Sequence, residues 1–191
     1  PISEDANTNF AVGASLLGVK PVVDVITSDF LYRSFDSIAN TAAKLNFVAP
    51  DGEPPRTIVI RSEFLTGGPT TGQRPEALFA HIPGLNIAIP STPNDAYGLM
   101  CTALASPGVT MFFEDRMISD SKTKPKDNDG LGPPTIPFGQ AIVRRRPEKP
   151  KLTLLTYGLM RQVVEIALEQ EQDNTVTLID LRTLYPIDWS L

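Results

Sequence analysis

Two side chains that often carry chemistry occur once each in this chain of 191 residues, His81 and Cys101. A zinc site needs about four nitrogen, sulfur or oxygen ligands, so one imidazole and one thiol fall short of a typical set. A Ser-His-Asp triad would have to use His81, which stands directly before the turn-forming Pro83 and Gly84. We therefore interpret His81 as a structural hydrogen-bonding residue and Cys101 as a small buried side chain in a helix. We predict no metal site formed by this chain.

A glycine-rich stretch at 67–72, "GGPTTG", has the spacing of a phosphate-binding loop. Such a loop continues with lysine and then serine or threonine, which hold the phosphates and a magnesium ion. Here Gln73 and Arg74 occupy these positions, so binding of a nucleoside triphosphate is excluded. The acidic stretch at 125–136 does not match a calcium-binding loop either, because proline stands at its first ligand position and isoleucine at its last.

One carboxylate stands out by its surroundings. Glu4 heads the stretch "EDANTNFAVGASLLG", in which small residues such as Ala11, Ala14 and Ser15 predict a helix that packs closely against another backbone. An acidic side chain at a helix N-terminus is favoured by the helix dipole. Its position at a helix N-terminus is therefore enough to explain a glutamate at residue 4, without a functional role.

Seventeen basic and twenty-two acidic residues give the chain a net charge of −5. This balance provides no positive surface for nucleic acid or for an acidic membrane, so we expect neither as a partner. The apolar runs stay below the ~18 residues of a membrane-spanning helix. The lone cysteine excludes an internal disulfide framework and favours a reducing compartment.

Four short runs rich in valine, isoleucine and phenylalanine are the predicted strands, at 21–28, 56–62, 85–90 and 108–114. Helical patterns lie between them, which is typical of parallel strands joined by crossover helices. We therefore predict an α/β fold with a mostly parallel sheet and helices on both of its faces.

Two of the helices have clear sequence signals. Residues 30–45 place apolar side chains at three- and four-residue spacing, as on one face of an amphipathic helix. Thr92 is expected to cap a second helix, with Pro93 in its first turn and Asp95 reaching back to the cap.

The composition divides the chain into a first domain at 1–145, a linker at 146–151 and the first part of a second α/β domain at 152–191. Residues 119–134 lack large apolar runs and are predicted to form a surface loop. The linker is the Pro- and Lys-rich "RPEKPK". Beyond it, one strand-helix-strand unit leads to Leu191, and we expect the second domain to be incomplete in this chain.

Several stretches resemble one known family in the same order along the chain. They are similar to the beta subunit of the thiamine-diphosphate-dependent decarboxylase component of 2-oxo acid dehydrogenase complexes, in "PVVDVITSDFLYRSFDSIANTAAK", "QRPEALFAHIPGLNIAIPSTPNDAYGLM", "TIPFGQAIV" and "VTLIDLRTLYPID". The pyruvate and branched-chain members are the most similar, and transketolase is a more distant relative. The resemblance implies a transketolase-like pyrimidine-binding domain, followed by the start of a transketolase C-terminal domain.

The resemblance implies that several residues bind thiamine diphosphate. Glu4, in "PISE", matches the glutamate that hydrogen-bonds the aminopyrimidine ring nitrogen and so promotes loss of the proton from the thiazolium carbon. Phe30, in "SDF", matches the aromatic residue that packs on the pyrimidine ring. Ile2 and Arg33 match positions that line the same pocket.

The comparison with this family also reveals a departure. In the family, the loop before "EALFAHIPGL" carries a catalytic histidine that steadies the substrate carboxylate or the acyl transfer to a lipoyl group. Counting back from "HIPGL", this position is Thr71, whereas Gln73 is retained and His81 matches a second, structural histidine. A hydroxyl cannot relay a proton near neutral pH, so we expect the step that the histidine serves to slow by about 10²-fold or more.

The rest of the cofactor site is implied to lie outside this chain. The family holds magnesium and the diphosphate with a Gly-Asp-Gly motif followed by asparagine, and this chain has no Gly-Asp-Gly. The resemblance thus implies that an alpha-type subunit, or a fused segment, supplies these groups and the magnesium. It also implies homo-pairing of beta units in a heterotetramer or a dimer of fused chains, and a lipoyl acyltransferase core as a partner. The expected location is the bacterial cytoplasm or the mitochondrial matrix.

We therefore expect the chain to act in the oxidative decarboxylation of pyruvate or a branched-chain 2-oxo acid, followed by acyl transfer to lipoyl. Two alternatives stay open. A non-catalytic homologue would keep the fold and the interface in a structural or regulatory role, which Thr71 favours and which Glu4 and Phe30 oppose. A thiamine-diphosphate enzyme of altered reaction, such as acetoin cleavage or carboligation, is the other alternative.

Overall fold

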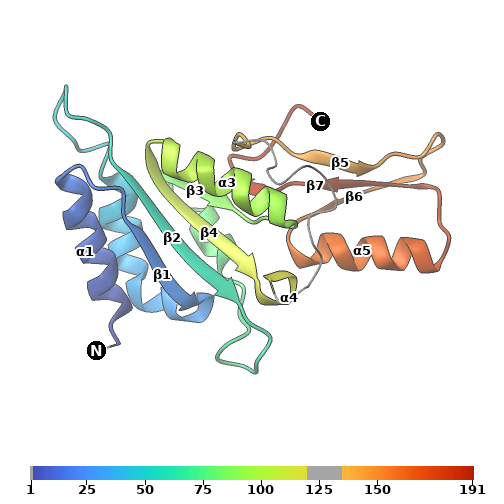
Figure 1. The fold of residues 1–191 in the computed structure, drawn as a ribbon, viewed down its shortest axis with the longest axis horizontal. Helices are drawn as coiled ribbons and strands as arrows, with labels where there is room; N and C mark the ends of the chain where they lie inside the picture. The colour runs from blue at the N-terminus through green and yellow to red at the C-terminus, as the bar shows by residue number, and fades with distance from the viewer. Residues whose placement is uncertain (1, 120–134) are drawn as a thin grey trace.

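The computed structural model describes residues 2–119 and 135–191, which form two β-sheets with helices packed on them (Figure 1). Of the predicted surface loop at 119–134, only Ser119 belongs to the described residues, and the stretch at 125–136 lies outside them up to residue 134. Within the described part of the chain, no helix has the length and apolar character needed to cross a bilayer.

The first sheet has five strands in the spatial order β1-β2-β4-β3-β8. In chain order they are β1 (Val22–Thr27), β2 (Thr57–Phe64), β3 (Leu85–Ala88), β4 (Gly108–Asp115) and β8 (Thr183–Tyr185). The first four strands run parallel, with Ile60 of β2 opposite Val23 on one side and Met111 on the other. β8 is antiparallel to β3. The four predicted strands and the mostly parallel sheet are therefore confirmed.

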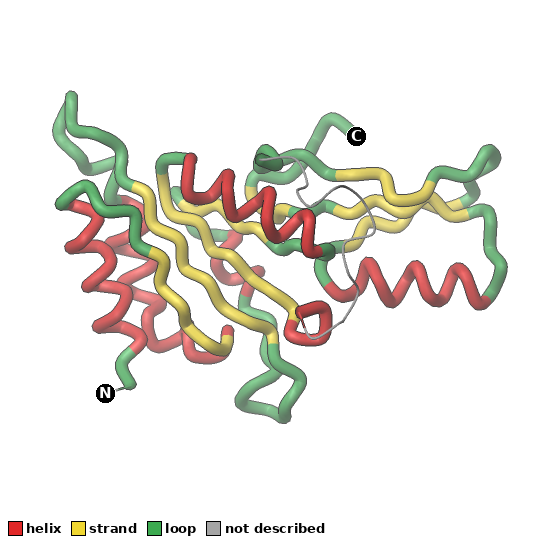
Figure 2. Tube along the Cα trace, in the orientation of Figure 1, coloured by secondary structure: helices red, strands yellow, loops and turns green. Residues whose placement is uncertain are grey.

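Helices cover both faces of this sheet, as predicted (Figure 2). One face carries α1 (Glu4–Leu16) and three short helices, η1 (Ser28–Ser34), η2 (Ser37–Thr41) and η3 (Ala42–Lys44). The other face carries α3 (Pro93–Ala105). Ile58 and Met111 belong to the core under α1, whereas Val59 and Phe112 belong to the core under α3. Because β2 and β4 are buried on both faces, they read as nearly continuous apolar runs.

The prediction of one regular amphipathic helix at 30–45 is wrong in one respect, because the segment is not a regular α-helix. The structure has three short helices there, of which η1 and η3 are 3-10 helices and η2 is a π-helix. The buried face was predicted correctly, since Leu31 and Ile38 are fully buried. Ser37, where the π-helical turn begins, accepts a hydrogen bond from the Asn9 amide of α1 at 2.7 Å. This bond ties the start of the π-helical turn to α1.

The second sheet has three strands in the order β5-β7-β6, and α5 (Leu159–Gln170) lies along it (Figure 1). The strands are β5 (Ile142–Arg145), β6 (Leu152–Thr156) and β7 (Val176–Asp180). The expected boundary at residue 145 does not coincide with the sheets, because β5 pairs with β7 while β8 pairs back with β3. The segment at 146–151 therefore connects two strands of one sheet. The division into domains itself stays a prediction.

Buried charges join the two sheets. Asp180 at the end of β7 pairs with Arg144 of β5 at 2.8 Å and accepts a hydrogen bond from Ser91, which follows β3. Arg144 also pairs with Asp95 of α3, and Arg161 of α5 donates to the carbonyl oxygen of Ser91 at 2.6 Å. Burial alone would lower the pKa of Arg144, but the nearby carboxylates of Asp95 and Asp180 raise it. These contacts hold the two sheets in one arrangement.

Candidate functional site

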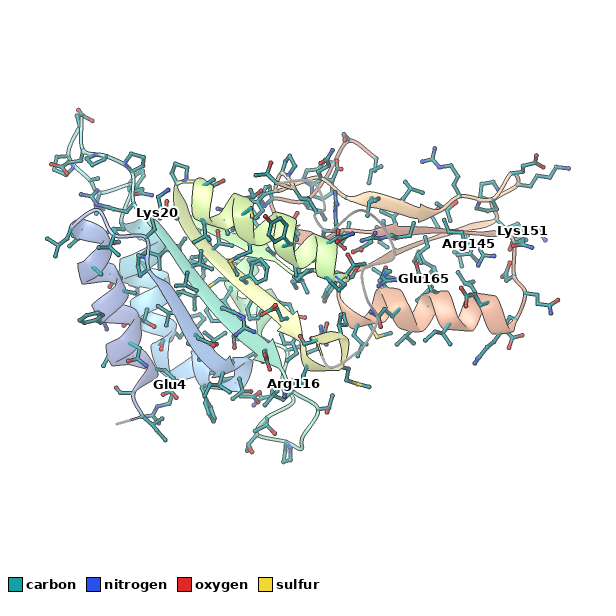
Figure 3. The ribbon with its side chains drawn as sticks, in the orientation of Figure 1. Glu4, Lys20, Arg116, Arg145, Lys151 and Glu165 are labelled. Carbon is teal, nitrogen blue, oxygen red and sulfur yellow. The ribbon has the colours of Figure 1, made fainter. Side chains whose placement is uncertain are left out.

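The carboxyl ends of three parallel strands meet at one edge of the first sheet. β1 is followed by η1, β2 by the loop at 65–75, and β4 by α4 (Arg116–Ser119). Figure 3 shows Glu4 at the lower end of α1, at the same end of the molecule as Arg116 after β4. Ligands of open parallel sheets bind outside the carboxyl ends of the strands. We therefore take these segments as the candidate site.

Glu4 is the first residue of α1, and only 8% of it is exposed. Its Oε2 atom is buried and has no hydrogen-bond partner among the described residues. The guanidinium of Arg33 lies beside it, but its Nε is 3.6 Å from Oε2, which is longer than a hydrogen bond. A buried acceptor without a donor is rare in folded proteins. This oxygen is therefore suited to accept a hydrogen bond from a ligand.

The other three residues expected at this site are exposed. Phe30 is 40% exposed, the Arg33 side chain 74% and Ile2, which precedes α1, 90%. Side chains three residues apart in a 3-10 helix lie above one another, so Phe30 and Arg33 share one face of η1. The structure thus brings Arg33 to Glu4 and places Phe30 on the same helix face as Arg33. Ile2 lies on the surface, so the site is open rather than enclosed.

Thr71 lies in the loop after β2, and its hydroxyl donates to the carbonyl oxygen of Gly67 in the same loop. Among the described residues, no hydrogen bond or ion pair joins Thr71 to Glu4. His81 follows α2 (Glu76–Ala80) and is exposed. Cys101 is partly buried inside α3. Within residues 2–119 and 135–191, neither Thr71 nor His81 therefore forms a hydrogen bond or an ion pair with the Glu4 carboxylate.

The loop that contains Thr71 is nevertheless bound to the helix that contains Phe30. The N–H of Gln73 donates to both carboxylate oxygens of Asp29 at 3.3 Å, and the hydroxyl of Ser28 donates to the carbonyl oxygen of Gln73 at 2.9 Å. Asp29 and Ser28 are buried residues of η1. The loop at 65–75 and η1 therefore form one unit at the strand ends.

A charged cluster that the sequence did not predict holds the end of this loop. Arg74 pairs with Asp115 at the end of β4, through Nη1 at 2.9 Å and Nη2 at 3.3 Å, and with Glu76 at 3.4 Å. Its guanidinium also lies over the ring of Phe64, 4.0 Å from the ring centre. Burial alone would lower the pKa of Arg74, but the hydrogen bond and charge of Asp115 raise it. The sequence signal was weak, because Asp115 follows a strand but Arg74 lies 41 residues away in a loop.

Tyr157, from the second sheet, extends this cluster. Its hydroxyl donates to Oε1 of Glu76 at 3.2 Å. Burial raises the pKa of Tyr157, and the Glu76 carboxylate raises it further. In residues 2–119 and 135–191, no three His, Cys, Asp or Glu side chains converge to hold a metal ion. The Asp115 carboxylate is paired with the Arg74 guanidinium and the Leu159 N–H, and Oε1 of Glu76 with Arg74 and the Tyr157 hydroxyl. The buried Oε2 of Glu76 has no hydrogen-bond partner among the described residues.

Comparison with known proteins defines the class of this chain. Residues 1–120 match the family model described as the pyrimidine-binding domain of transketolase. This match covers more than half of the chain, so the chain belongs to that family.

The curated relatives narrow the similarity further. They include the 2-oxoisovalerate dehydrogenase subunit beta of Bacillus subtilis, which is 32% identical over 98% of this chain and 57% of its own length. The acetoin:2,6-dichlorophenolindophenol oxidoreductase subunit beta of Cupriavidus necator is 32% identical over 98% of this chain and 55% of its own length. This chain thus spans about half the length of the curated relatives that it matches. The predicted resemblance to beta subunits of 2-oxo acid dehydrogenases is confirmed.

The solved structures support the predicted fold. A split-gene transketolase described as an inactive beta4 tetramer superimposes with a TM-score of 0.75 at 18% identity, over 98% of this chain and 57% of that one. Transketolase from Leishmania mexicana gives the same TM-score at 17% identity, over 95% of this chain and 26% of that one. At such low identity, the similarity concerns the fold alone.

Proposed function

We propose that the chain is the beta-type subunit, or segment, of a thiamine-diphosphate-dependent 2-oxo acid dehydrogenase and that Glu4 binds the aminopyrimidine end of the cofactor. The observation that carries this proposal is the buried Oε2 atom of Glu4, which has no hydrogen-bond partner among the described residues. A protonated ring nitrogen supplies the donor that this oxygen lacks. The exposed ring of Phe30, on the adjoining helix, offers a face for packing against an aromatic heterocycle. The residues present therefore fit the aminopyrimidine.

Bound thiamine diphosphate supplies a nucleophilic carbon and an electron sink for the decarboxylation of a 2-oxo acid. Glu4 shares a proton with the ring nitrogen, and this hydrogen bond is strengthened because the carboxylate is only 8% exposed. Phe30 packs on the ring, and Ile2 and Arg33 line the rim of the site. Asp29 holds the Thr71 loop against η1, the helix that contains Phe30 and Arg33, by accepting the N–H of Gln73.

The open surface around Glu4 supports completion of the site by another polypeptide. Ile2 and Phe30 expose apolar area that a partner would bury, and the chain has no Gly-Asp-Gly motif for magnesium and diphosphate. An alpha-type subunit or fused segment supplies both in this proposal. Beta units pair with one another, and a lipoyl acyltransferase core accepts the acyl group. Mitochondrial and bacterial relatives support a location in the mitochondrial matrix or the bacterial cytoplasm.

A titration of thiamine diphosphate with magnesium into the full-length protein and its partner tests the role of Glu4. We expect Glu4→Gln to weaken binding by about 10- to 100-fold, the value of a hydrogen bond to a charged group. Asp5→Asn is the matched control, because Asp5 is a carboxylate of the same helical turn but is exposed. Equal affinities of wild type and Glu4→Gln would reject the assignment. A loss of the same size in Asp5→Asn would indicate an effect of charge at the helix end instead.

The reaction has a second candidate, because the acetoin relative is as similar to this chain as the branched-chain relative is, at 32% identity. Turnover of pyruvate, 2-oxoisovalerate and acetoin with 2,6-dichlorophenolindophenol distinguishes them. We expect turnover of a 2-oxo acid. Turnover of acetoin alone supports the altered reaction, and no turnover of any of the three supports a non-catalytic role.

Thr71 allows a separate test of catalytic competence. We expect Thr71→His to raise the rate of acyl transfer to a lipoyl acceptor, since an imidazole relays protons near neutral pH and a hydroxyl does not. Thr70→His places the same ring one residue away and serves as the control. An unchanged rate in Thr71→His would show that another group performs this step.

A further inference from the structure

We propose that Arg74 is a positioning residue that couples the Thr71 loop to the second sheet. The inference rests on the proposed function, because it treats this loop as the border of the cofactor site. The loop has two attachments. Gln73 binds it to η1, which contains Phe30 and Arg33, and Arg74 binds it to Asp115 at the end of β4.

The attachment through Arg74 is strong and directional. The guanidinium makes two N–H bonds to one carboxylate, that of Asp115, which is only 4% exposed. A paired fork of this kind is stronger and more specific in geometry than a single ion pair. The guanidinium also lies over the ring of Phe64, which adds a cation–π contact. The Arg74 side chain is therefore held in one conformation, and this restricts the positions of the loop residues that precede it.

The same Asp115 carboxylate also receives a bond from the second sheet's helix. Its Oδ2 accepts the N–H of Leu159, the first residue of α5, at 2.8 Å. Gly158 precedes this helix with a φ of +54°, and a Cβ added there would overlap Oδ2 of Asp115. Only a glycine allows the carboxylate to reach the helix N-terminus so closely. The carboxylate that pairs with Arg74 is thus also hydrogen-bonded to the first residue of α5.

These contacts form one continuous path. It runs from the start of α5 through Asp115 and Arg74 to Gln73, and from Gln73 through Asp29 to η1. The contacts at Asp115 and at Asp29 are hydrogen bonds to buried carboxylates, and the chain itself joins Arg74 to Gln73, so a displacement at one end weakens the pairing of a buried carboxylate unless the next group moves with it. The hydrogen bond from α5 to Asp115 therefore helps to hold the Thr71 loop in place, in addition to the attachments at Gln73 and Arg74.

Amide hydrogen exchange on the full-length protein with its partner tests this coupling. In Arg74→Gln, we expect the amides of the loop at 65–75 to exchange about 10-fold faster or more, the cost of losing a charge-assisted bond. Arg74→Lys keeps the charge but not the fork, so it should give an intermediate rate. Arg56→Gln is the matched control, since Arg56 pairs with Glu53 at 3.4 Å at the opposite end of β2.

Gly158→Ala is the decisive variant, because it changes the second sheet's unit and leaves the loop sequence intact. We expect the loop amides to exchange faster than in wild type, while the core amides of β2 and β4 serve as the reference for global stability. Unchanged loop exchange in either Arg74→Gln or Gly158→Ala would overturn the proposal. So would acceleration of the loop and the core by the same factor, which indicates plain destabilisation.

A kinetic measurement connects the coupling to the proposed activity. With a 2-oxo acid and an artificial electron acceptor, we expect Arg74→Gln to lower kcat by about 10- to 100-fold through misplacement of the loop. The Kd for thiamine diphosphate should change less than kcat, because none of the proposed cofactor-binding residues is replaced. An unchanged kcat would remove the positioning role. The exchange measurement needs neither cofactor nor turnover, so it decides the coupling even if the proposed function fails.

Discussion

Replacement of Gly84 by alanine is expected to destabilise the protein strongly, because two separate costs meet at this position. Gly84 has a φ of +98°, where a residue with a Cβ is strained. An added Cβ would also overlap the carbonyl oxygen of Ala43 and lie 3.0 Å from its carbonyl carbon. These are backbone atoms of η3 itself, so relief requires the turn or the helix to shift. Backbone strain of about 1–2 kcal/mol and overpacking of about 1–3 kcal/mol together remove about 2–5 kcal/mol of unfolding free energy.

Thermal unfolding of three alanine variants separates the two costs. Gly13→Ala, inside α1, has nothing within 4 Å of the added Cβ and should gain about 0.5–1 kcal/mol of helix stability. Gly52→Ala, at a φ of +87° in open space, carries the backbone strain alone. Gly84→Ala should lower Tm by about 4–20 °C, at about 2–4 °C per kcal/mol for a chain of this size. Equal losses in Gly84→Ala and Gly52→Ala would refute the close contact between this turn and η3.

Three further changes probe the charges. Asp180→Ala removes one of the two buried carboxylates that pair with Arg144 and also the acceptor of the Ser91 hydroxyl, so it should cost about 1–3 kcal/mol in urea unfolding; a loss within the error of the measurement would show that the cluster does not join the sheets. Tyr157 has a pKa raised above its ordinary 10.0, so its stabilisation is present below pH 10 and is lost as pH rises through the folded pKa. Tyr157→Phe should lack this alkaline loss, and parallel unfolding curves for both proteins above pH 10 would contradict it. The Thr175 hydroxyl, and then its N–H, lower the pKa of Asp173 below its ordinary 3.8, so this contribution is present above 3.8 and is lost as pH falls through the folded pKa. The Tm advantage of wild type over Asp173→Asn should therefore disappear in acid, and an advantage that persists there would exclude this carboxylate as the cause.

The parts of the fold that were predictable depend on local signals. The helix at Thr92 begins as expected, because Thr92 Oγ1 accepts the N–H of Asp95 at 3.1 Å and donates to its carboxylate at 2.6 Å. All the atoms of this cap lie within four residues of sequence. The apolar run of β2 was recognisable for a similar reason, since burial on both faces leaves no alternation to interpret.

The parts that were missed depend on pairs far apart in the chain. Tyr185 of β8 lies opposite Ile87 of β3, and β5 joins the second sheet opposite β7. A three-residue strand such as β8 has no periodicity of its own, so its assignment comes from the partner edge that it meets. Arg74 and Asp115 likewise belong to no sequence motif that would indicate their pairing. Their roles appear only once β2 and β4 lie side by side.

In the candidate site, too, the sequence indicates some features, whereas others depend on contacts between distant residues. Glu4 alone is an ordinary acidic residue at a helix N-terminus, and its proposed role came from resemblance to a family. The structure adds that its Oε2 atom is buried and lacks a hydrogen-bond partner among the described residues. Sequence could not show this, because it depends on how Arg33 of η1 approaches α1 without closing to hydrogen-bond distance.

The environment of Glu4 favours a site of which this chain forms one half. A buried acceptor without a donor costs about 1–3 kcal/mol, and exposed Ile2 and Phe30 keep apolar area in water. Both costs are relieved when a ligand N–H meets Oε2 and another polypeptide covers the rim. The anchors of this proposed half-site are Glu4 in α1 and Asp29 in η1, which belong to helices packed on one face of the sheet. Under the proposed function, these packed helices keep the geometry of the half-site before a partner covers it, so less ordering is needed for the cofactor to bind.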